Sequence, residues 1–450
     1  MADLYEKLKE YNKRNICPMH MPGHKRKTGI CKEIDITEIE GFDNLASPCG
    51  IIKEMADKWA EVYNADKAFL SVNGSTGAII AAIAAFCNKG DKIIMARNCH
   101  KSVYNAAELM SLEAVYVYPS YDENGIAGGI SAKEIEKAAE ATPDAALIVI
   151  TSPTYEGIIS DVKAICEIAH SKNIPVFTDC AHGAHLGFMG IKTPIDCGAD
   201  AACVSLHKTL PSMTQTALLL AKGERADFNV MQEKMNVFQT SSPSYVLMSS
   251  MGEFLEFVSC QKKFEEYQKR LDLFYEKAKS LKNLQIKTEG GFAVDKGKIV
   301  IITNKANISG QKLMEILRRE YKIELEMAYD CYALAMTSVC DTDEDFKRLF
   351  DALCEIDKGL KSVKAKKVNY PKPLKSDCKS SEKELVSLKA AKGRICADYV
   401  WAYPPGIPIL TPGEVIDEAV FEYLINLCDT KLTGRSIAET DKIFVVKQKV

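Results

Sequence analysis

The sequence predicts an α/β protein whose first domain has a largely parallel sheet and whose second domain is smaller. Short apolar runs alternate with helical segments along the first half of the chain, a pattern that places helices on both faces of a sheet. Most of these runs are continuously hydrophobic, which is typical of buried parallel strands. After Ser249 the pattern changes to long charged helices, and 450 residues are enough for two or three domains.

Apolar spacing predicts the elements of the first domain. A short helix is expected at Leu4–Lys13 and another at Ile51–Asn64, whose apolar residues can share one face. Strands are expected at seven apolar runs: Ala68–Val72, Lys92–Ala96, Ala114–Tyr118, Ala146–Thr151, Ile174–Thr178, Ala201–Ser205 and Thr216–Ala221. Helices are expected between many of them: Gly77–Asn88, Lys101–Met110, Ala132–Ala141 and Val162–Lys172.

The second domain is predicted from a different mixture of elements. A long charged helix is expected at Gly252–Lys282. Strands and helices then follow at Ile299–Thr303, Ser309–Tyr321, Ile323–Tyr329, Tyr332–Ser338 and Asp343–Lys358. The weakly patterned stretch Lys361–Ser381, which carries Lys and Pro, is the best candidate for a linker, and a last helix is expected from Glu414 to Leu427.

Composition and charge exclude several classes of protein. Hydrophobic residues make up 47% and charged residues 26% of the chain, which rules out a wholly disordered protein. With 58 Lys and Arg against 61 Asp and Glu, the net charge is −3, so the chain lacks the net basic field of nucleic-acid or membrane-surface proteins. The longest apolar stretch, Ala78 to Cys87, is ten residues, short of the ~20 that span a bilayer. The polar N-terminus does not resemble a signal peptide, so we expect a cytoplasmic protein.

The sixteen cysteines give no sign of a metal or redox motif. The two nearest in sequence, Cys197 and Cys203, are six positions apart, so the chain has no CxxC pair. Zinc-ribbon and dithiol-redox sites therefore lack their usual signature. We expect free thiols in a reducing compartment.

A glycine- and hydroxyl-bearing motif, Asn73-Gly-Ser-Thr-Gly77, lies between a predicted strand and an apolar helix. Gly74 permits close backbone approach, Ser75 and Thr76 offer hydroxyls, and a helix N-terminus favours an anion. The motif can therefore cradle a phosphate, although Ser or Thr at this place can also simply cap the helix.

Two charged residues stand at the carboxyl ends of predicted strands. Lys208 closes the motif Ser205-Leu-His-Lys208, and Asp179 follows the strand Ile174–Thr178. A desolvated lysine has a lowered pKa, and its neutral amine can form a Schiff base with an aldehyde. A carboxylate such as that of Asp179 can keep a ring nitrogen protonated, while the alternative for either residue is that it faces water.

Histidines near the same strand ends carry weaker signals. His100 can stack on a planar ring, whereas Cys99 beside it is not expected to act as a nucleophile, because adjacent residues rarely point at each other. His182 and His185 are three positions apart, but Gly183 and the strand-end position suit a helical metal pair poorly, and no third ligand is evident. No metal site is predicted.

Together these features match one chemistry. A phosphate cradle, a ring-stacking histidine, an acid for a pyridine nitrogen and a Schiff-base lysine are all expected at strand carboxyl ends of one α/β domain. This combination describes a site for pyridoxal 5′-phosphate (PLP).

The chain resembles the Orn/Lys/Arg decarboxylase family, a branch of the aspartate-aminotransferase-like (fold type I) PLP enzymes. The likeness covers nearly the whole chain. Within the family, the chain resembles the compact members found in Gram-positive bacteria. It rests on ordered motifs: Met21-Pro-Gly-His-Lys25, Asp35-Ile-Thr-Glu38, Gly41-Phe-Asp-Asn-Leu45, Asn73-Gly-Ser-Thr76, His100-Lys-Ser102, Pro153-Thr-Tyr-Glu-Gly157, Asp179-Cys-Ala-His-Gly-Ala-His185, Ser205-Leu-His-Lys-Thr-Leu-Pro211, Thr240-Ser-Ser-Pro-Ser-Tyr245 and Tyr403-Pro-Pro-Gly-Ile-Pro408.

The resemblance implies a role for each matching residue. Lys208 would hold the cofactor as a Schiff base, Asp179 would partner the pyridine nitrogen and stabilise the quinonoid left after CO2 departs, and His207 or Lys208 would reprotonate Cα. The implied catalytic residues are Lys208, Asp179, His100 and His207. The implied cofactor-binding residues are Gly74, Ser75, Thr76, His100, Asp179, Ala181, His182, Ser205, His207 and Lys208.

The resemblance also implies an architecture and an assembly. We expect an N-terminal segment at residues 1–45, a large PLP-binding domain with a mainly parallel sheet at 46–260, a smaller α/β domain at 261–365, and a linker with a C-terminal family segment at 366–450. In this fold the segment Gln239–Tyr245 tends to approach the partner subunit's site. That implies a homodimer with shared active sites and no nucleic-acid or membrane partner.

The expected reaction is decarboxylation of arginine, lysine or ornithine to the corresponding amine. Cys180 stands where Glu is usual, but Asp179 is retained, so the cofactor electronics should survive. Asn44 and Ala46 stand where Asp and His are usual, and this departure leaves the substrate open. Candidates to bind a basic side chain are Asp330, Glu414, Tyr155, Tyr329, Tyr332 and Tyr403. The alternatives are a non-catalytic binding protein or an aminotransferase, which would grip the α-carboxylate with one of Arg318, Arg319, Arg348 or Arg394.

Overall fold

The computed structural model describes residues 17–19, 43–258, 260–288, 291–366, 368, 370–376, 382–402, 406–427, 432–434 and 442–447. The predicted helix Leu4–Lys13 and the motifs Met21–Lys25 and Asp35–Glu38 lie outside these residues, as do Gly41, Phe42 and the first three residues of the motif that begins at Tyr403. By its contacts the chain divides into one unit of Met1–Arg97 with Ser102–Lys366, and a second of Asn98–Lys101 with Lys367–Val450.

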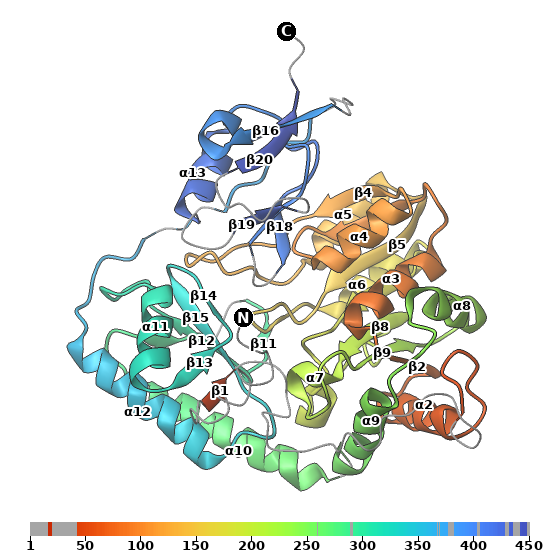
Figure 1. The fold of residues 1–450 in the computed structure, drawn as a ribbon, viewed down its shortest axis with the longest axis horizontal. Coiled ribbons are helices and arrows are strands. Elements are labelled where there is room, and N and C mark those ends of the chain that lie inside the picture. Colours follow the sequence, from red (N-terminus) through yellow and green to blue (C-terminus); the bar gives the residue numbers. More distant parts are fainter. Residues whose placement is uncertain are drawn as a thin grey trace, which may run out of the picture. The chain divides into compact units, whose positions relative to one another are not determined.

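A seven-stranded sheet is the largest sheet of the first unit (Figure 1). Its strand order is β2-β9-β8-β7-β5-β3-β4, and only β9 runs antiparallel to its neighbours. The strands span Lys67–Ser71 (β2), Lys92–Ala96 (β3), Glu113–Val117 (β4), Ala145–Thr151 (β5), Val176–Asp179 (β7), Ala201–Ser205 (β8) and Ala217–Ala221 (β9). The mainly parallel sheet predicted from the apolar runs is therefore confirmed.

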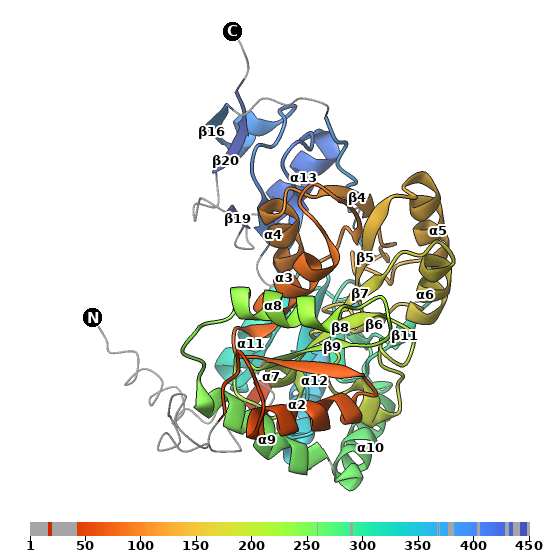
Figure 2. The same ribbon diagram turned by 90° about the vertical axis from the view of Figure 1, so that its right-hand side faces the viewer.

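Helices cover both faces of this sheet, as the alternating pattern predicts. Figure 2 shows α5 and α6 on one face and α3 and α4 on the other. The helices span Gly74–Phe86 (α3), Lys101–Leu109 (α4), Ala132–Ala141 (α5) and Val162–Ser171 (α6). Helix α3 is apolar almost all round because it lies buried between the sheet and α8 (Phe228–Phe238).

Three further helices build the core beside β2. They are α2 (Ile51–Val62), α9 (Tyr245–Val258) and α10 (Gln261–Ala278), and Trp59 of α2 stacks on Phe254 of α9 with ring centroids 6.0 Å apart. The single helix predicted at Gly252–Lys282 is wrong, because Cys260 leaves the helical conformation between α9 and α10. The break lets Phe257 and Phe264 pack edge to face.

A four-stranded antiparallel sheet completes the first unit. Its order is β10-β12-β15-β14, and α10 and α12 lie side by side along it (Figure 1). The elements span Gln285–Ile286 (β10), Lys298–Ile302 (β12), Gly310–Glu320 (α11), Met327–Ala328 (β14), Tyr332–Met336 (β15) and Asp343–Gly359 (α12). Both predicted domains contribute to this one compact unit, so the boundary between residues 260 and 261 stays a prediction.

Two short pairings within the first unit have no counterpart in the sequence prediction. Strand β1 (Cys17–Met19) pairs in parallel with β13 (Ile323–Leu325), and β6 (Ile158–Ile159) pairs with β11 (Ala293–Val294). The strand predicted at Ile323–Tyr329 is therefore divided at Glu326, because β13 pairs with β1 while β14 pairs with β15.

The second unit contains two small antiparallel sheets and a helix. One sheet joins β16 to β20, and the other has the order β18-β17-β19. The elements span Lys383–Ser387 (β16), Val400–Ala402 (β17), Ile407–Leu410 (β18), Glu418–Asn426 (α13), Leu432–Gly434 (β19) and Lys442–Val446 (β20). The last predicted helix thus begins four residues later than expected, with Asp417 as its cap.

The thirteen cysteines among the described residues are free thiols, as expected. No helix in the described part of the chain is long and apolar enough to cross a membrane.

The loop before α2 is organised by one carboxylate. The Asp43 side chain accepts five backbone hydrogen bonds, from the amides of Asn44, Cys49, Gly50, Ile52 and Lys53. Burial opposes the charge of Asp43, but the amides outweigh it and lower the pKa of this carboxyl. Asn44 Oδ1 accepts a hydrogen bond from the Ala46 amide at 2.8 Å. Asn44 and Ala46, which both depart from the pattern that the resemblance implies, therefore form a turn here.

Replacing Asp43 should destabilise the fold. Asp43→Asn is expected to lower the free energy of unfolding by about 1 kcal/mol, the usual value of a helix-capping oxygen. Because the folded-state pKa lies below the unfolded value of about 3.9, this contribution is complete above that pH and is lost as the solution becomes more acidic. Urea unfolding at neutral and acidic pH measures both effects.

A matched control is Asp57→Asn, which removes only an exposed pair with Lys53 on α2. Its effect should be a few tenths of a kcal/mol. An Asp43 variant as stable as this control at neutral pH would contradict the capping role.

Candidate active site

Strands β5, β7 and β8 end side by side at one edge of the large sheet. Asp179, the last residue of β7, is paired with Thr151 on β5 and with Cys203 on β8. The segments that follow these strands carry most of the predicted site residues, including Ser205 at the end of β8 and Lys208 in the one-turn helix α7 (Leu206–Thr209). Parallel strand direction is what gathers them.

Lys208 contacts a histidine from the neighbouring strand end. Its Nζ lies 2.8 Å from His182 Nε2. Burial lowers the pKa of Lys208, although the charges of Asp179 and Glu326 favour its ammonium form. A lysine with a lowered pKa is a stronger nucleophile at neutral pH, because more of its amine is neutral. A neutral amine is what formation of a Schiff base requires.

Asp179 is buried close to Lys208. Its Oδ1 accepts a hydrogen bond from the Ala181 amide at 3.1 Å. Burial raises the pKa of Asp179, while the positive charge of Lys208 opposes that shift. A second cationic group, such as a protonated ring nitrogen, would further favour the carboxylate form.

The glycine- and hydroxyl-bearing motif forms the first turn of α3, which begins at Gly74 and so starts three residues earlier than predicted. The side chain of the cap residue Asn73 does not bond to the helix and instead donates to the Phe238 carbonyl oxygen at 3.0 Å. Gly74 has φ +68°, and a Cβ built on it would meet open space. Ser102 Oγ donates to Thr76 Oγ1 at 3.3 Å.

Buried hydroxyls without partners lie beside these strand ends. Within the described part of the chain, Ser205 Oγ, Thr178 Oγ1 and Thr209 Oγ1 have no hydrogen-bond partner. Buried polar atoms are normally bonded, so an unpartnered hydroxyl marks a place where a ligand can bind. His207 differs, because its Nδ1 donates to the Thr216 carbonyl oxygen at 3.0 Å.

The histidines of the motif Asp179–His185 have separate partners. His182 lies between two lysines, since its Nδ1 is 3.2 Å from Lys298 Nζ while its Nε2 contacts Lys208. His185 Nε2 lies 3.0 Å from Asp295 Oδ1. The described residues contain no cluster of three or more potential ligands for a metal ion.

Sequence reasoning missed Lys298, Asp295 and Glu326. Lys298 is 1% exposed and begins the otherwise apolar strand β12. Glu326 accepts a hydrogen bond from the Tyr155 hydroxyl, and the Tyr155 ring packs on that of His182 with centroids 4.4 Å apart. The sequence offered one signal for Lys298, which stands directly before four apolar residues. A lysine is seldom fully buried unless it is paired.

His100 precedes α4 and belongs by its contacts to the second unit. Its role in stacking on a cofactor ring therefore stays a prediction.

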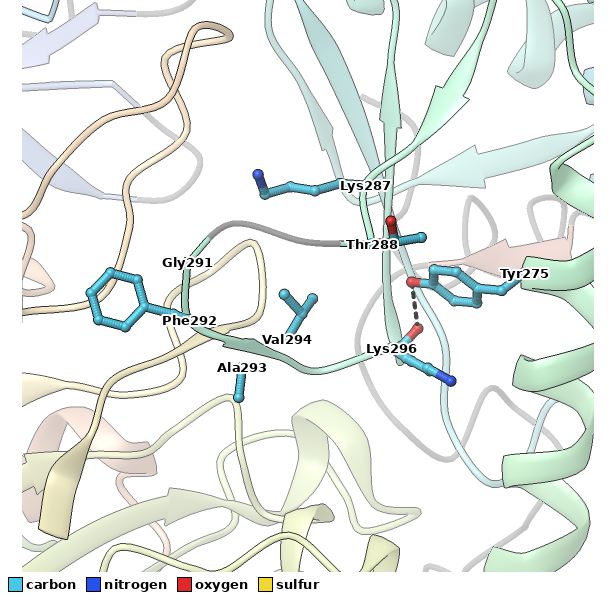
Figure 3. Close-up of a pocket in the computed structure, with 8 residues that line it drawn as sticks. All are labelled: Tyr275, Lys287, Thr288, Gly291, Phe292, Ala293, Val294 and Lys296. Atoms are coloured by element: carbon cyan, nitrogen blue, oxygen red, sulfur yellow. Dashed lines mark hydrogen bonds between the residues drawn. The ribbon is translucent and has the colours of Figure 1, made fainter.

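A separate hollow beside β11 contains none of the predicted site residues (Figure 3). It has a volume of about 470 Å³ and is lined by Tyr275, Lys287, Thr288, Gly291, Phe292, Ala293, Val294 and Lys296. The amines of Lys287 and Lys296 point away from each other and pair with Asp122 and Asp272 respectively. Because both lysines have carboxylate partners, their presence does not require a charged ligand in this hollow.

Comparison with protein families identifies the chain. Residues 2–338 match the model of the Orn/Lys/Arg decarboxylase major domain, and residues 357–433 match that of the Orn/Lys/Arg decarboxylase C-terminal domain. The chain belongs to the Orn/Lys/Arg decarboxylase family. It is an amino acid decarboxylase, as the ordered motifs predict.

Individual relatives agree with the family. The chain is 32% identical to an arginine decarboxylase of Bacillus anthracis, over 94% of this chain and 92% of that one. Lysine decarboxylase A from Pseudomonas aeruginosa is similar in structure with a TM-score of 0.76 at 18% identity, over 92% of this chain and 74% of that one. A structure of SPT with PLP matches 68% of this chain and 76% of that one, with a TM-score of 0.54 and 13% identity. The fold is thus the aspartate-aminotransferase-like fold that the resemblance implies.

Restoring the family's usual residue at position 180 should harm this protein. Cys180 is fully buried, and a Cβ at Gly183 would lie only 2.5 Å from its Sγ. Cys180→Glu would place a second carboxyl beside Asp179 with no cation assigned to it, so we expect the free energy of unfolding to fall by at least about 2 kcal/mol. Urea unfolding of the PLP-free protein measures it.

Cys180→Ala is the control, because it removes a small apolar group without adding charge. Its effect should be clearly smaller than that of the glutamate. Equal stability of Cys180→Glu and the unmodified protein would show that the site accommodates the carboxyl after all.

Proposed function

We propose that this decarboxylase acts on a basic L-amino acid, namely arginine, lysine or ornithine, with PLP as its cofactor and Lys208 as the residue that carries it. The half-buried Lys208, whose amine is held against His182 close to Asp179, is the observation that carries the proposal. The likeness to an arginine decarboxylase over most of both chains supports a basic substrate.

The residues present suit PLP. The unpartnered Ser205 hydroxyl, the open space beside Gly74 and the first turn of α3 would bind the phosphate. The buried Asp179 carboxylate would face the pyridine nitrogen, and Ala181, whose amide bonds to Asp179, would lie next to the ring. PLP, when bound, accepts the electron pair that departing CO2 leaves behind.

Each polar residue of the site has a definable task. The neutral Lys208 amine would bind the cofactor aldehyde, and Asp179 would hold a proton on the ring nitrogen. After CO2 leaves, Lys208 Nζ is better suited than His207 to return a proton to Cα. In neutral His207 the proton lies on Nδ1, which donates to the Thr216 carbonyl oxygen, so Nε2 would accept rather than donate.

The arginines that an aminotransferase would need are engaged elsewhere. Arg318 pairs with Glu324, Arg319 with Glu315 and Arg394 with Glu384. Arg348 donates to the carbonyl oxygens of Tyr321 and Lys322. These contacts favour decarboxylation over transamination, which requires a firmly held α-carboxylate.

Glu326 and Tyr155 are the best candidates near Lys208 to interact with a cationic substrate. The carboxylates named from the sequence have other contacts, because Asp330 pairs with Lys366 and Glu414 accepts from the Thr411 amide. Tyr332 donates to Glu156 in a buried contact.

Lys208→Ala should abolish turnover, because it removes the amine that would carry the cofactor. The purified, PLP-loaded protein is incubated separately with L-arginine, L-lysine and L-ornithine without keto acid, and CO2 and amine are followed by mass spectrometry. One dominant amine in equal amount to CO2 is expected from the unmodified protein.

Lys234→Ala, which alters a half-buried lysine paired with Glu233, is the control and should keep full activity. Retained activity in Lys208→Ala would remove the assignment. Amino-group transfer only after a keto acid is added would favour the aminotransferase alternative.

Ser205→Ala should weaken PLP binding without weakening the ligand-free fold, because its buried hydroxyl has no partner to lose. A hydrogen bond to a charged phosphate contributes about 1.5–3 kcal/mol, so the Kd should rise about tenfold or more. Titration of the PLP-free protein and urea unfolding provide the two readouts.

Ser212→Ala is the matched control, since this buried hydroxyl bonds to Ser250 and Thr216. It should lower stability and leave the Kd nearly unchanged. The reverse pattern in the two variants would place the phosphate elsewhere.

A further inference from the structure

Lys298 is the first residue of β12 in the four-stranded antiparallel sheet. Its side chain reaches His182 in the candidate active site. It is 1% exposed, and its Nζ lies 3.2 Å from His182 Nδ1. On the other side of the same ring, Nε2 lies 2.8 Å from Lys208 Nζ. One imidazole therefore bridges two lysine side chains, one from α7 and the other from β12.

Hydrogen-bond chemistry restricts how these three groups can be protonated. An ammonium can only donate, and a neutral imidazole has one N–H and one accepting nitrogen. The two lysines therefore cannot both be ammonium groups that donate to a neutral His182. One lysine must accept from the ring, and only a neutral amine can do so.

Burial lowers the pKa of Lys208 although Asp179 and Glu326 favour its ammonium form, so Lys208 is the better candidate for the neutral amine. Lys298 lies close to the buried carboxylate of Asp295, whose other partners are His185 and the Gly297 amide. Burial opposes the charge of Asp295, but His185 and Lys298 outweigh it and keep the pKa of this carboxyl low. A neutral Lys298 would remove one of the two positive groups that stabilise this buried charge, at an energetic cost.

The path of Lys298 into the site is built into the fold. Gly157 has φ +89°, and a Cβ at this position would lie 2.8 Å from Lys298 Cγ and 2.9 Å from its Cβ. The aliphatic part of Lys298 thus rests on the backbone of the motif Pro153–Gly157. The Tyr155 ring in the same motif packs on the His182 ring and limits its rotation.

We propose that Lys298 is a positioning residue that acts through His182. Its ammonium donates to Nδ1 and so keeps the His182 proton on Nε2, from which His182 donates to Lys208 and holds it as a neutral amine. The inference rests on the proposed function only because it takes Lys208 to be the residue that carries the cofactor. Charged and titratable groups around Lys208 besides His182 are Asp179, Glu326 and Cys203.

The protonation of His182 tests the proposal directly in the unmodified protein. PLP-free protein is labelled with 15N-histidine, and the His182 signals among the seven histidines are assigned by comparison with His182→Phe. The expected result is a hydrogen on Nε2 and a bare Nδ1. A hydrogen on Nδ1, alone or together with one on Nε2, would overturn the proposal.

A variant series tests the coupling. The rate at which Lys208 reacts with acetic anhydride is followed against pH in PLP-free protein by peptide mass spectrometry. Lys298→Met should raise the apparent pKa of Lys208 by about one unit, which lowers its rate at neutral pH about tenfold. In a His182→Phe background, Lys298→Met should cause no further change.

The control is Lys287→Met, which removes a lysine that follows β10 of the four-stranded sheet and pairs with Asp122, and it should leave the Lys208 profile unchanged. Equal shifts with and without His182 would mean that Lys298 acts only through its charge, and no shift would mean that it does not act on Lys208. Neither readout uses cofactor or turnover, so failure here is distinct from failure of the Lys208→Ala assay.

Discussion

Parallel alignment of β5, β7 and β8 is the constraint on which the candidate site depends. Because these strands run in one direction, Asp179, Ser205 and the turn that bears Lys208 all follow strand ends at the same edge. The antiparallel β9 on the far side of β8 supports this edge, since Leu206 N and His207 Nδ1 both bond to the Thr216 carbonyl oxygen just before β9. Loss of register in this part of the sheet would separate every group that the chemistry needs.

Burial then converts proximity into reactivity. In water the Lys208 amine would be protonated and Asp179 ionised, and neither group would be distinctive. At the sheet edge, desolvation lowers the pKa of Lys208 and raises that of Asp179. The two shifts have the same physical origin, so the site depends on exclusion of water as much as on the identity of its residues.

Periodicity in the sequence was enough to predict the large sheet and its covering helices, because each is a local pattern of apolar residues. The break between α9 and α10 was not predictable in the same way, since it depends on how Phe257 and Phe264 pack after folding. For the site, local motifs predicted Lys208 and Asp179. Lys298 was missed because its partner His182 is more than a hundred residues away, in the turn that follows a strand of the other sheet.

The contact between Gly157 and Lys298 has a consequence for how this sequence can diverge. A methyl group at position 157 would lie within 2.9 Å of the lysine stem, so a larger residue there requires the loop or the lysine to shift. The two positions are therefore not free to vary independently, although they are 141 positions apart in the chain. Gly157 in a loop beside the large sheet and Lys298 at the start of β12 are therefore expected to change together during evolution.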